Sequence, residues 1–280
     1  MQENASVIRS NQNQYVSLTR GLSSKKNREE SRLFRFDGIK LACEAIAKGV
    51  ELEALILREG AEEAVKAKAS ELYRVSIDEL SCRILTVSAD IFDKLSEESA
   101  PEGVIAIARY QDDMHIEREG GVDGGTYDGE KILLLESVRD PLNMGAIIRV
   151  AAAFGVDRMI VSRDCADIYN SKTVRASMGT LFGMRIDRYS DICNAISILR
   201  AQGRRVFAAA LDRDSKKLGA SEKSVNDCVI IGNEGHGLSR EAIDACDATV
   251  FIPMADGVES LNAATAAAVL VWEFFGRNFA

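Results

Sequence analysis

The sequence predicts an α/β protein in two parts, of which the C-terminal part is built on a parallel β-sheet. Three observations lead to this fold class. Helix-like and strand-like stretches alternate along the chain, a glycine-rich acidic segment divides it, and three polar, glycine-bearing loops each follow a short apolar run. The 280 residues are enough for two domains of ordinary size.

The N-terminal part is predicted to be a small α/β sandwich. Apolar residues at helical spacing predict a helix over residues 36–48, and a stretch rich in Ala, Glu and Lys predicts another over 62–72. Runs rich in Leu, Ile and Val predict strands over 52–57 and 104–108.

A flexible linker is predicted between the two parts. Residues 113–129 contain several glycines with acidic residues between them. Such a composition cannot bury a core and favours a flexible connection. We therefore expect one domain over residues 1–112, this linker, and a second domain over residues 130–280.

The C-terminal part alternates strands and helices. Short runs rich in Val, Ile and Leu predict strands over residues 131–136, 158–161, 205–211, 228–231 and 249–252. Helical spacing predicts helices over residues 144–154, 173–181, 192–201, 239–245 and 260–275. Short strands without polar alternation predict a parallel sheet that helices cover on both faces. The last helix is apolar nearly all round, so we expect it to be buried in the core or against a partner subunit.

Composition argues against several classes of protein. No apolar run approaches the ~20 residues that span a bilayer, and the polar N-terminus lacks the apolar stretch of a signal peptide. We therefore expect a cytoplasmic protein. The six cysteines are scattered and there are only two histidines, so no zinc site is expected. Disulfides are not expected in the cytoplasm.

The charge distribution neither excludes nor establishes binding to nucleic acid. The net charge of -8 argues against a protein that coats nucleic acid indiscriminately. Basic side chains nevertheless crowd the first forty residues: Arg9, Arg20, Lys25, Lys26, Arg28, Arg32, Arg35 and Lys40. Charge alone does not decide between a solvated helix face and a surface that binds nucleic acid.

Three loops of the C-terminal part carry the candidate site. The first contains Asn143, Gly145 and Arg149, the second reads Gly-Asn-Glu-Gly-His-Gly-Leu-Ser over residues 232–239, and the third covers residues 252–262. Loops that follow parallel strands are where such sheets bind ligands, so one composite site is expected. No Gly-x-Gly-x-x-Gly follows the first strand, which argues against a dinucleotide site.

In order and spacing, these loops resemble the three motifs of the SpoU (TrmH-type) RNA 2′-O-methyltransferases of the SPOUT superfamily. Residues 173–179 resemble a further segment of that family, and the resemblance covers the whole C-terminal domain. The N-terminal domain resembles, more loosely, the ribosomal-protein-like substrate-binding domain of many members.

The resemblance implies a fold and an activity. It implies a parallel sheet with a C-terminal trefoil knot, S-adenosylmethionine held in the knot, and a homodimer whose site uses both subunits. It implies methyl transfer to a ribose 2′-hydroxyl of structured RNA, with no membrane or metal partner. The separate N-terminal domain favours ribosomal over transfer RNA. The alternatives are a transfer RNA substrate, a non-catalytic RNA-binding protein of the same fold, and a small-molecule methyltransferase, which would leave the basic N-terminus unexplained.

The resemblance also assigns the site residues. Cofactor binding is expected at Leu211, Gly232, Asn233, Glu234, Gly235, Ile252, Met254 and Leu261. Catalytic roles are expected for Asn143, Arg149, Glu234, Ser260 and Asn262. Contacts to RNA are expected at Arg28, Arg32, Arg149 and Arg175.

Ordinary structural roles remain open for several of these residues. A guanidinium group is a poor base, so Arg149 is expected to grip phosphate and stabilise the developing alkoxide. Its alternative is a salt bridge with Glu136. Asn143 could instead cap a helix, and Glu234 could be a glutamate in a first helical turn, where the helix dipole stabilises its negative charge. His236 lies inside the second motif and is expected to be structural or exposed.

Overall fold

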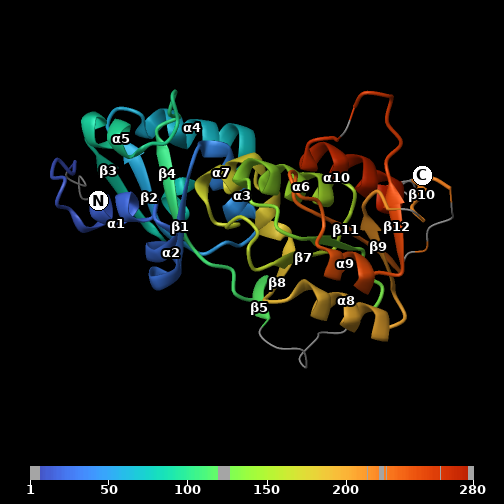
Figure 1. The fold of residues 1–280 in the computed structure, drawn as a ribbon. Coiled ribbons are helices and arrows are strands. Elements are labelled where there is room, and N and C mark those ends of the chain that lie inside the picture. The colour runs from blue at the N-terminus through green and yellow to red at the C-terminus, as the bar shows by residue number, and fades with distance from the viewer. Residues whose placement is uncertain are drawn as a thin grey trace. The chain divides into compact units, whose positions relative to one another are not determined.

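The computed structural model describes residues 7–118, 127–212, 214–220, 224, 226–258 and 260–276. The chain forms two compact units (Figure 1). Unit 1 comprises Met1–Gln111 and Tyr169–Phe182, and unit 2 comprises Asp112–Ile168 and Gly183–Ala280. Unit 1 thus takes in a segment from the middle of the predicted second domain.

Unit 1 is an α/β unit around a four-stranded mixed sheet. Its strands are β1 (Leu33–Asp37), β2 (Leu52–Arg58), β3 (Arg83–Val87) and β4 (Val104–Arg109), in the order β1-β4-β2-β3. Its helices are α1 (Gln14–Gly21), α2 (Lys25–Ser31), α3 (Ile39–Ala47), α4 (Glu62–Tyr73), η1 (Ile77–Glu79), α5 (Ala89–Leu95), α7 (Ser171–Ala176) and η2 (Thr180–Gly183). The helix predicted from residue 36 begins at Ile39, because β1 occupies the residues before it.

Unit 2 is built on an eight-stranded sheet in which every neighbouring pair is parallel, as predicted. The order is β10-β12-β9-β11-β6-β7-β8-β5. The strands are β5 (His115–Arg118), β6 (Ile132–Leu135), β7 (Arg158–Ser162), β8 (Arg185–Tyr189), β9 (Arg205–Ala209), β10 (Lys216–Lys217), β11 (Asp227–Ile231) and β12 (Ala248–Phe251). The helices are α6 (Pro141–Ala153), α8 (Ile192–Ala201), α9 (Arg240–Ala245), α10 (Ala263–Val271) and η3 (Trp272–Gly276).

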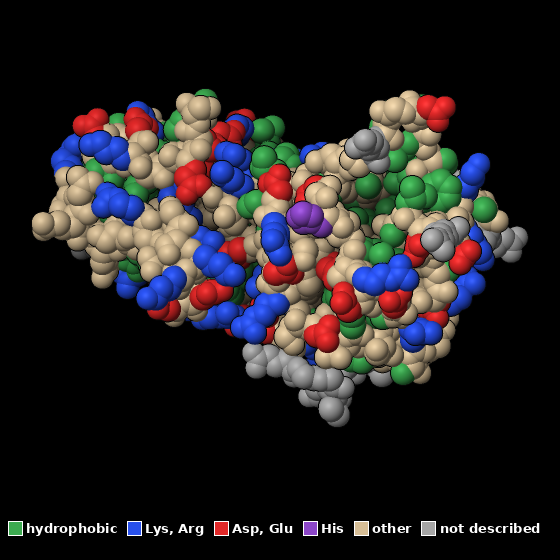
Figure 2. Space-filling model, viewed as in Figure 1, with side chains coloured by type: hydrophobic (Ala, Val, Ile, Leu, Met, Phe, Trp, Pro, Cys, Tyr) green, Lys and Arg blue, Asp and Glu red, His purple; other side chains and the backbone are tan. Residues whose placement is uncertain are grey.

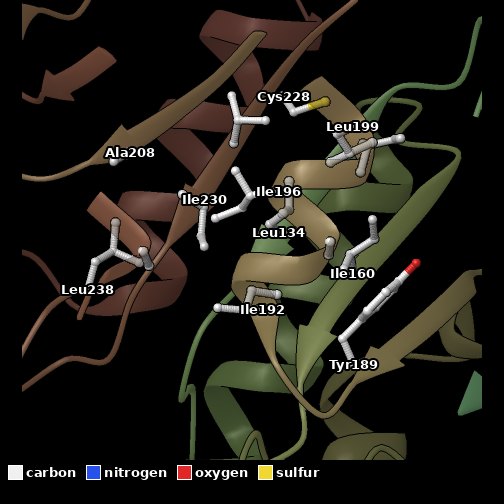
Figure 3. Close-up of a cluster of buried hydrophobic side chains, with 14 of the residues drawn as sticks. Leu134, Ile160, Tyr189, Ile192, Ile196, Leu199, Ala208, Cys228, Ile230 and Leu238 are labelled. Atoms are coloured by element: carbon white, nitrogen blue, oxygen red, sulfur yellow. The ribbon is translucent and has the colours of Figure 1, made fainter. Parts of the chain in front are cut away.

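The core of unit 2 shows why the apolar runs become central strands. Figure 3 shows α8 presenting Ile192, Ile196 and Leu199 toward the sheet. Spacings of four and three residues place these side chains on one helix face. They pack in one buried cluster with Leu134 of β6 and Ile230 of β11. Each such side chain contributes about 1.5–3 kcal/mol when it is fully buried.

Both ends of the predicted linker belong to the folded part of unit 2. His115–Arg118 form β5, which pairs with β8. Near the other end Tyr127 is 1% exposed, and its backbone N–H donates to Gln202 Oε1 at 3.2 Å. Residues 119–126 lie outside the described residues. The composition did not indicate this strand, because backbone pairing holds it and three of its four side chains are polar.

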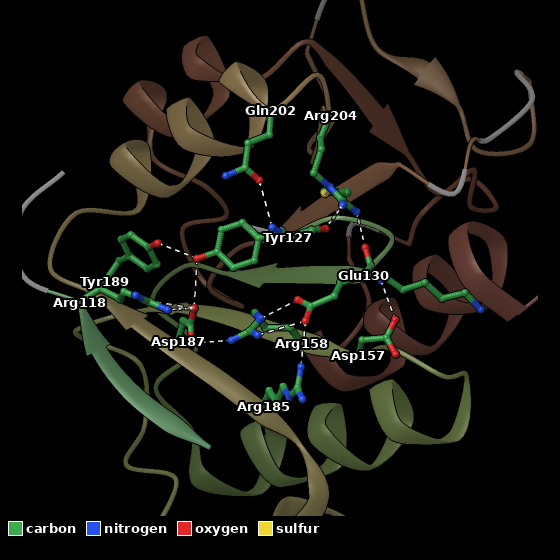
Figure 4. A network of polar contacts seen from close by, with 12 residues as sticks. Arg118, Tyr127, Glu130, Asp157, Arg158, Arg185, Asp187, Tyr189, Gln202 and Arg204 are labelled. Carbon is green, nitrogen blue, oxygen red and sulfur yellow. Dashed lines mark hydrogen bonds and ion pairs between the residues drawn. The ribbon is translucent and has the colours of Figure 1, made fainter. Parts of the chain in front are cut away.

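A polar network centres on Asp187 of β8 (Figure 4). Asp187 is fully buried and accepts hydrogen bonds from Arg158 Nη1 at 2.9 Å, Arg118 Nη2 at 3.2 Å and Tyr127 Oη at 3.1 Å. Tyr127 Oη also lies 2.8 Å from Tyr189 Oη. Burial raises the pKa of Tyr127, so its hydroxyl remains protonated at neutral pH. The carboxylate can be buried here because cations and a hydroxyl surround it.

The last helix is buried on one side only within a single chain. α10 packs on α6, and it buries Ala267 and Leu270. Val269 and Trp272 remain 38% and 47% exposed. No helix in the described part of the chain is long and apolar enough to cross a membrane.

Candidate functional site

The three predicted loops lie at one edge of the unit 2 sheet. They follow β6, β11 and β12, and β9 lies between β11 and β12 in the strand order. Because the strands are parallel, their carboxyl ends meet at the same edge. The topology therefore brings the first loop beside the other two, although Asn143 lies 91 residues before Glu234 and 119 residues before Asn262.

One side chain from each loop joins a hydrogen-bonded chain. Asn143 Nδ2 donates to Glu234 Oε1 at 2.5 Å, and Asn262 Nδ2 donates to Asn143 Oδ1 at 2.9 Å. Asn262 also caps α10 by accepting from the backbone N–H of Ala264. Asn143 does not cap α6, because Asp140 holds that position. Three of the five predicted catalytic residues are thus in direct contact.

The second loop is held by its own Asn233. Asn233 Oδ1 accepts from the backbone N–H of Gly235 at 2.8 Å and of His236 at 3.2 Å. Asn233 and Gly237 also exchange two backbone hydrogen bonds, of 3.0 and 2.9 Å. Gly237 has a φ of +68°, which glycine adopts without strain. The loop is therefore a closed turn.

A cavity of about 450 Å³ opens beside these loops. It is lined by the carboxyl ends of β9, β11 and β12 and by the start of α10. Seven of the eight predicted cofactor residues line it: Leu211, Gly232, Asn233, Glu234, Ile252, Met254 and Leu261. Gly235 is not among the lining residues, whereas Ser260 is. Glu259 of the third motif lies outside the described residues.

The sequence interpretation missed other lining residues. Ala209 and Ala210 line the cavity because they end β9, and His236 lines it from the second loop. Their position after a parallel strand was the available signal for the two alanines. His236 is exposed, as expected, yet it contributes to the wall.

Two family models match the chain. The SpoU rRNA Methylase family matches residues 130–272, and the MRM3-like substrate binding domain matches residues 13–106. The chain belongs to the SpoU rRNA methylase family.

Relatives of this SpoU family member match over nearly its whole length. The 23S rRNA (guanosine(2553)-2′-O)-methyltransferase RlmP of Bacillus subtilis is 28% identical, over 96% of this chain and 99% of the relative. The crystal structure of an rRNA methyltransferase from Sinorhizobium meliloti is similar, with a TM-score of 0.80 and 28% identity over 98% and 99% of the two chains. The AdoMet-bound form of that enzyme has a TM-score of 0.79, with the same identity and coverage.

Arg149 stands apart from the hydrogen-bonded chain in this family member. It is exposed on α6, and the described residues offer its side chain no hydrogen bond or ion pair. It lies six positions after Asn143, so the two side chains point about 120° apart around the helix axis. The alternative salt bridge with Glu136 does not form, because Glu136 accepts from Ser239 Oγ at 2.7 Å and Ser239 N at 2.8 Å.

The predicted RNA contacts divide into three cases. Arg28 is 2% exposed, and its Nη1 donates to the carbonyls of Leu22 at 2.7 Å and Ser23 at 3.0 Å, so it cannot reach a phosphate. Arg32 is exposed, and its guanidinium lies 4.4 Å from the ring centroid of Tyr110. Arg175, exposed on α7, borders a small hollow lined by carboxylates.

Carboxylates pair with much of the basic N-terminal run. Lys25 pairs with Glu29 and Lys26 with Glu30 one helical turn away. In Figure 2, lysine and arginine side chains are interspersed with aspartate and glutamate on the visible face. On α2 the two lysines are thus partly balanced by carboxylates of the same helix.

All six cysteines are free, and burial raises the pKa of Cys246 to about 12. Among the described residues, no group of three or more His, Cys, Asp or Glu side chains could hold a metal ion.

Replacing Arg28 with methionine is expected to lower the free energy of unfolding by about 2–4 kcal/mol, because the buried carbonyl of Leu22 and the part-buried carbonyl of Ser23 lose a charged donor. Arg32→Met is the matched control, since Arg32 is exposed and its ring contact is worth about 1 kcal/mol or less. Urea unfolding of both variants measures the difference. Equal loss in both would show that burial of Arg28 does not matter.

Replacing Gly232 with alanine is expected to disrupt the cavity wall. A Cβ at Gly232 would lie 2.4 Å from the carbonyl carbon of Gly237 and 2.5 Å from the backbone nitrogen of Leu238. These contacts are backbone atoms, which cannot change rotamer as a side chain can, so the loop itself must shift. We expect ligand affinity at the cavity to fall at least about a hundredfold.

Gly235→Ala is the control for that substitution. Its Cβ would meet Asn233 Oδ1 at 3.5 Å, an ordinary contact. Calorimetric titration of both variants with S-adenosylmethionine compares them. Equal affinity of Gly232→Ala and the unmodified protein would contradict the packing argument.

Proposed function

We propose that this protein transfers a methyl group from S-adenosylmethionine to a ribose 2′-hydroxyl of ribosomal RNA in the cytoplasm. The cavity at the carboxyl edge of the sheet, with the chain Asn143–Glu234–Asn262 at its side, carries the proposal. Membership of the SpoU rRNA methylase family supports it. So does the likeness to relatives named as rRNA methyltransferases.

The cavity suits S-adenosylmethionine. Its volume of about 450 Å³ is ordinary for a small-molecule site. Leu211, Ile252 and Leu261 offer apolar walls, and the strand ends offer backbone N–H and C=O groups. Gly232 lets backbone atoms pack where a Cβ would collide. The bound cofactor supplies a methyl group on a sulfonium whose positive charge disappears as the methyl leaves. Walls of apolar and backbone groups favour that loss of charge.

The polar residues bind and orient the RNA ribose. Glu234 fixes the orientation of Asn143 by accepting a hydrogen bond from the Asn143 side-chain amide. Asn143 and Asn262 then present amide groups to the sugar, and Ser260 on the cavity wall binds the adjacent phosphate. Arg149 grips phosphate and stabilises the negative charge that develops on the 2′-oxygen.

A homodimer completes the site in this proposal. Arg149 lies outside the hydrogen-bonded chain of its own subunit and has no competing partner among the described residues. Three large apolar side chains are exposed nearby: Leu142 on α6, Val269 on α10 and Trp272 at the end of α10. A second copy that covers these helices would bury the apolar groups and bring its own arginine to the cavity. The trefoil knot around the cofactor belongs to the same proposal.

Unit 1 is proposed as the RNA-binding part. Its match to a substrate-binding domain model supports this role. Arg32 and Arg175 remain the candidate phosphate contacts, since both are exposed. Binding through phosphates would weaken steeply with added salt, whereas a small-molecule substrate would show no such slope.

Two measurements test the proposal. Calorimetry of the full chain with S-adenosylmethionine should give a saturable one-site titration. Transfer of a labelled methyl group to deproteinised ribosomal RNA should then yield label that resists alkaline cleavage, as 2′-O-methylation does. Label on transfer RNA alone would favour the alternative substrate. Failure of the dimeric protein to bind the cofactor, with or without RNA, would favour a non-catalytic RNA-binding protein.

A further inference from the structure

Asp164 is the centre of a hydrogen-bonded cluster that lies outside the cavity lining. It follows β7, and its Oδ2 accepts from Ser137 Oγ at 2.5 Å and Arg139 Nη2 at 2.8 Å. Its Oδ1 accepts from Ser162 Oγ at 2.6 Å, and Ser162 Oγ in turn accepts from the backbone N–H of Ser137 at 2.9 Å. Asp164 therefore holds Ser137 both directly and through Ser162.

Ser137 has a backbone that glycine normally adopts. Its φ is +56°, in the left-handed region where a residue with a Cβ is uncommon. Such a conformation persists only where the surroundings over-determine it. Two hydrogen bonds supply this constraint. The Ser137 hydroxyl donates to Asp164, and the Ser137 backbone N–H donates to Ser162.

The carbonyl of Ser137 connects this cluster to the cavity. It accepts from Asn233 Nδ2 at 2.8 Å, and Asn233 Oδ1 accepts from the backbone N–H groups of Gly235 and His236. Within the same loop, Glu234 binds Asn143. A continuous path of hydrogen bonds and one short backbone segment thus links Asp164 to the loop at residues 232–237, which lines the cavity.

We propose that Asp164 is a positioning residue: it holds Ser137 in the left-handed conformation and, through Asn233, fixes the loop that forms one wall of the cofactor cavity. The identity of the ligand rests on the proposed function, whereas the positioning of the loop does not. Partial burial raises the pKa of Asp164, but hydrogen bonds from Ser137, Ser162 and Arg139 outweigh it and hold the pKa at about 2. The carboxylate therefore only accepts hydrogen bonds at neutral pH.

The test uses Asp164→Asn, whose amide cannot accept on both sides as a carboxylate does. In the free protein, amide exchange measured by mass spectrometry on the peptide that covers residues 232–238 should accelerate about tenfold, because the loop loses its anchor. The Kd for S-adenosylmethionine should rise about tenfold. The thermal midpoint should fall little, since the Asp164 side chain is 44% exposed. A structural role alone would lower the midpoint and accelerate exchange throughout unit 2.

Two further variants define the route. Arg139→Gln removes only the exposed ion pair with Asp164 and should leave exchange and affinity near those of the unmodified protein. Ser137→Gly keeps the left-handed backbone accessible but removes the hydroxyl, so it should reproduce the loosened loop. Ser137→Gly leaves the route through Ser162 and the backbone N–H of residue 137 intact, so adding Asp164→Asn should loosen the loop further, but by less than the sum of the two single effects.

The two proposals fail in different ways. Unchanged exchange of residues 232–238 in Asp164→Asn would overturn the positioning role, even in a protein that binds S-adenosylmethionine well. Additive effects of the two substitutions would also overturn it. If the unmodified protein bound no S-adenosylmethionine, the proposed function would fail, and the exchange measurement would still decide the role of Asp164.

Discussion

Replacing Arg149 with alanine is expected to lower kcat for methyl transfer by about a thousandfold and to leave the Kd for S-adenosylmethionine unchanged. The guanidinium is exposed and unpaired among the described residues, so it is available to RNA. It does not line the cavity, which is why cofactor affinity should not change. Steady-state methyl transfer at saturating ribosomal RNA measures kcat, and calorimetry measures Kd.

Two variants make the Arg149 result interpretable. Arg163→Ala removes another exposed arginine of unit 2, outside the three loops, and should leave kcat within about twofold. Arg149→Lys keeps the charge but loses the bidentate geometry, so it should recover only part of the rate. Methyl transfer by Arg149→Ala at the unmodified rate would remove this residue from the chemistry.

Replacing Asp187 with asparagine is expected to lower the free energy of unfolding by about 3–5 kcal/mol. The carboxylate is fully buried and bonded to Arg158, Arg118 and Tyr127 (Figure 4). An amide would leave two guanidinium groups without their shared counter-charge in a poorly solvated place. Urea unfolding, with fluorescence as the probe, gives the change in free energy.

Arg185→Gln is the control for Asp187→Asn. Arg185 is 54% exposed and pairs with Glu130 at the edge of the same network, so its loss should cost about 1 kcal/mol or less. Similar unfolding midpoints for the two variants would mean that burial of Asp187 contributes nothing beyond an ordinary surface pair.

The central strands could be predicted because their side chains are apolar, and runs of apolar residues indicate burial. β6, β7, β9, β11 and β12 are short apolar runs, and all five predictions hold. β5 and β8 were missed because they carry charged residues, among them Arg118 and Asp187. Asp187 is fully buried and Arg118 half-buried, because each finds its partner on the neighbouring strand or segment. No local sequence pattern indicates such a partner.

The sequence by itself determined the fold class, the parallel sheet and the three loops that carry the family motifs, since these depend on local runs of apolar residues and on residue types at fixed spacing. Only the tertiary structure decided which of those residues touch. Asn143 meets Glu234 and Asn262 across 91 and 119 residues, because β11 lies beside β6 in the strand order. Likewise Arg28 is buried and Arg149 exposed, although both are arginines in helices. Burial and hydrogen-bond partners depend on which elements pack together, and that information is distributed over the whole chain.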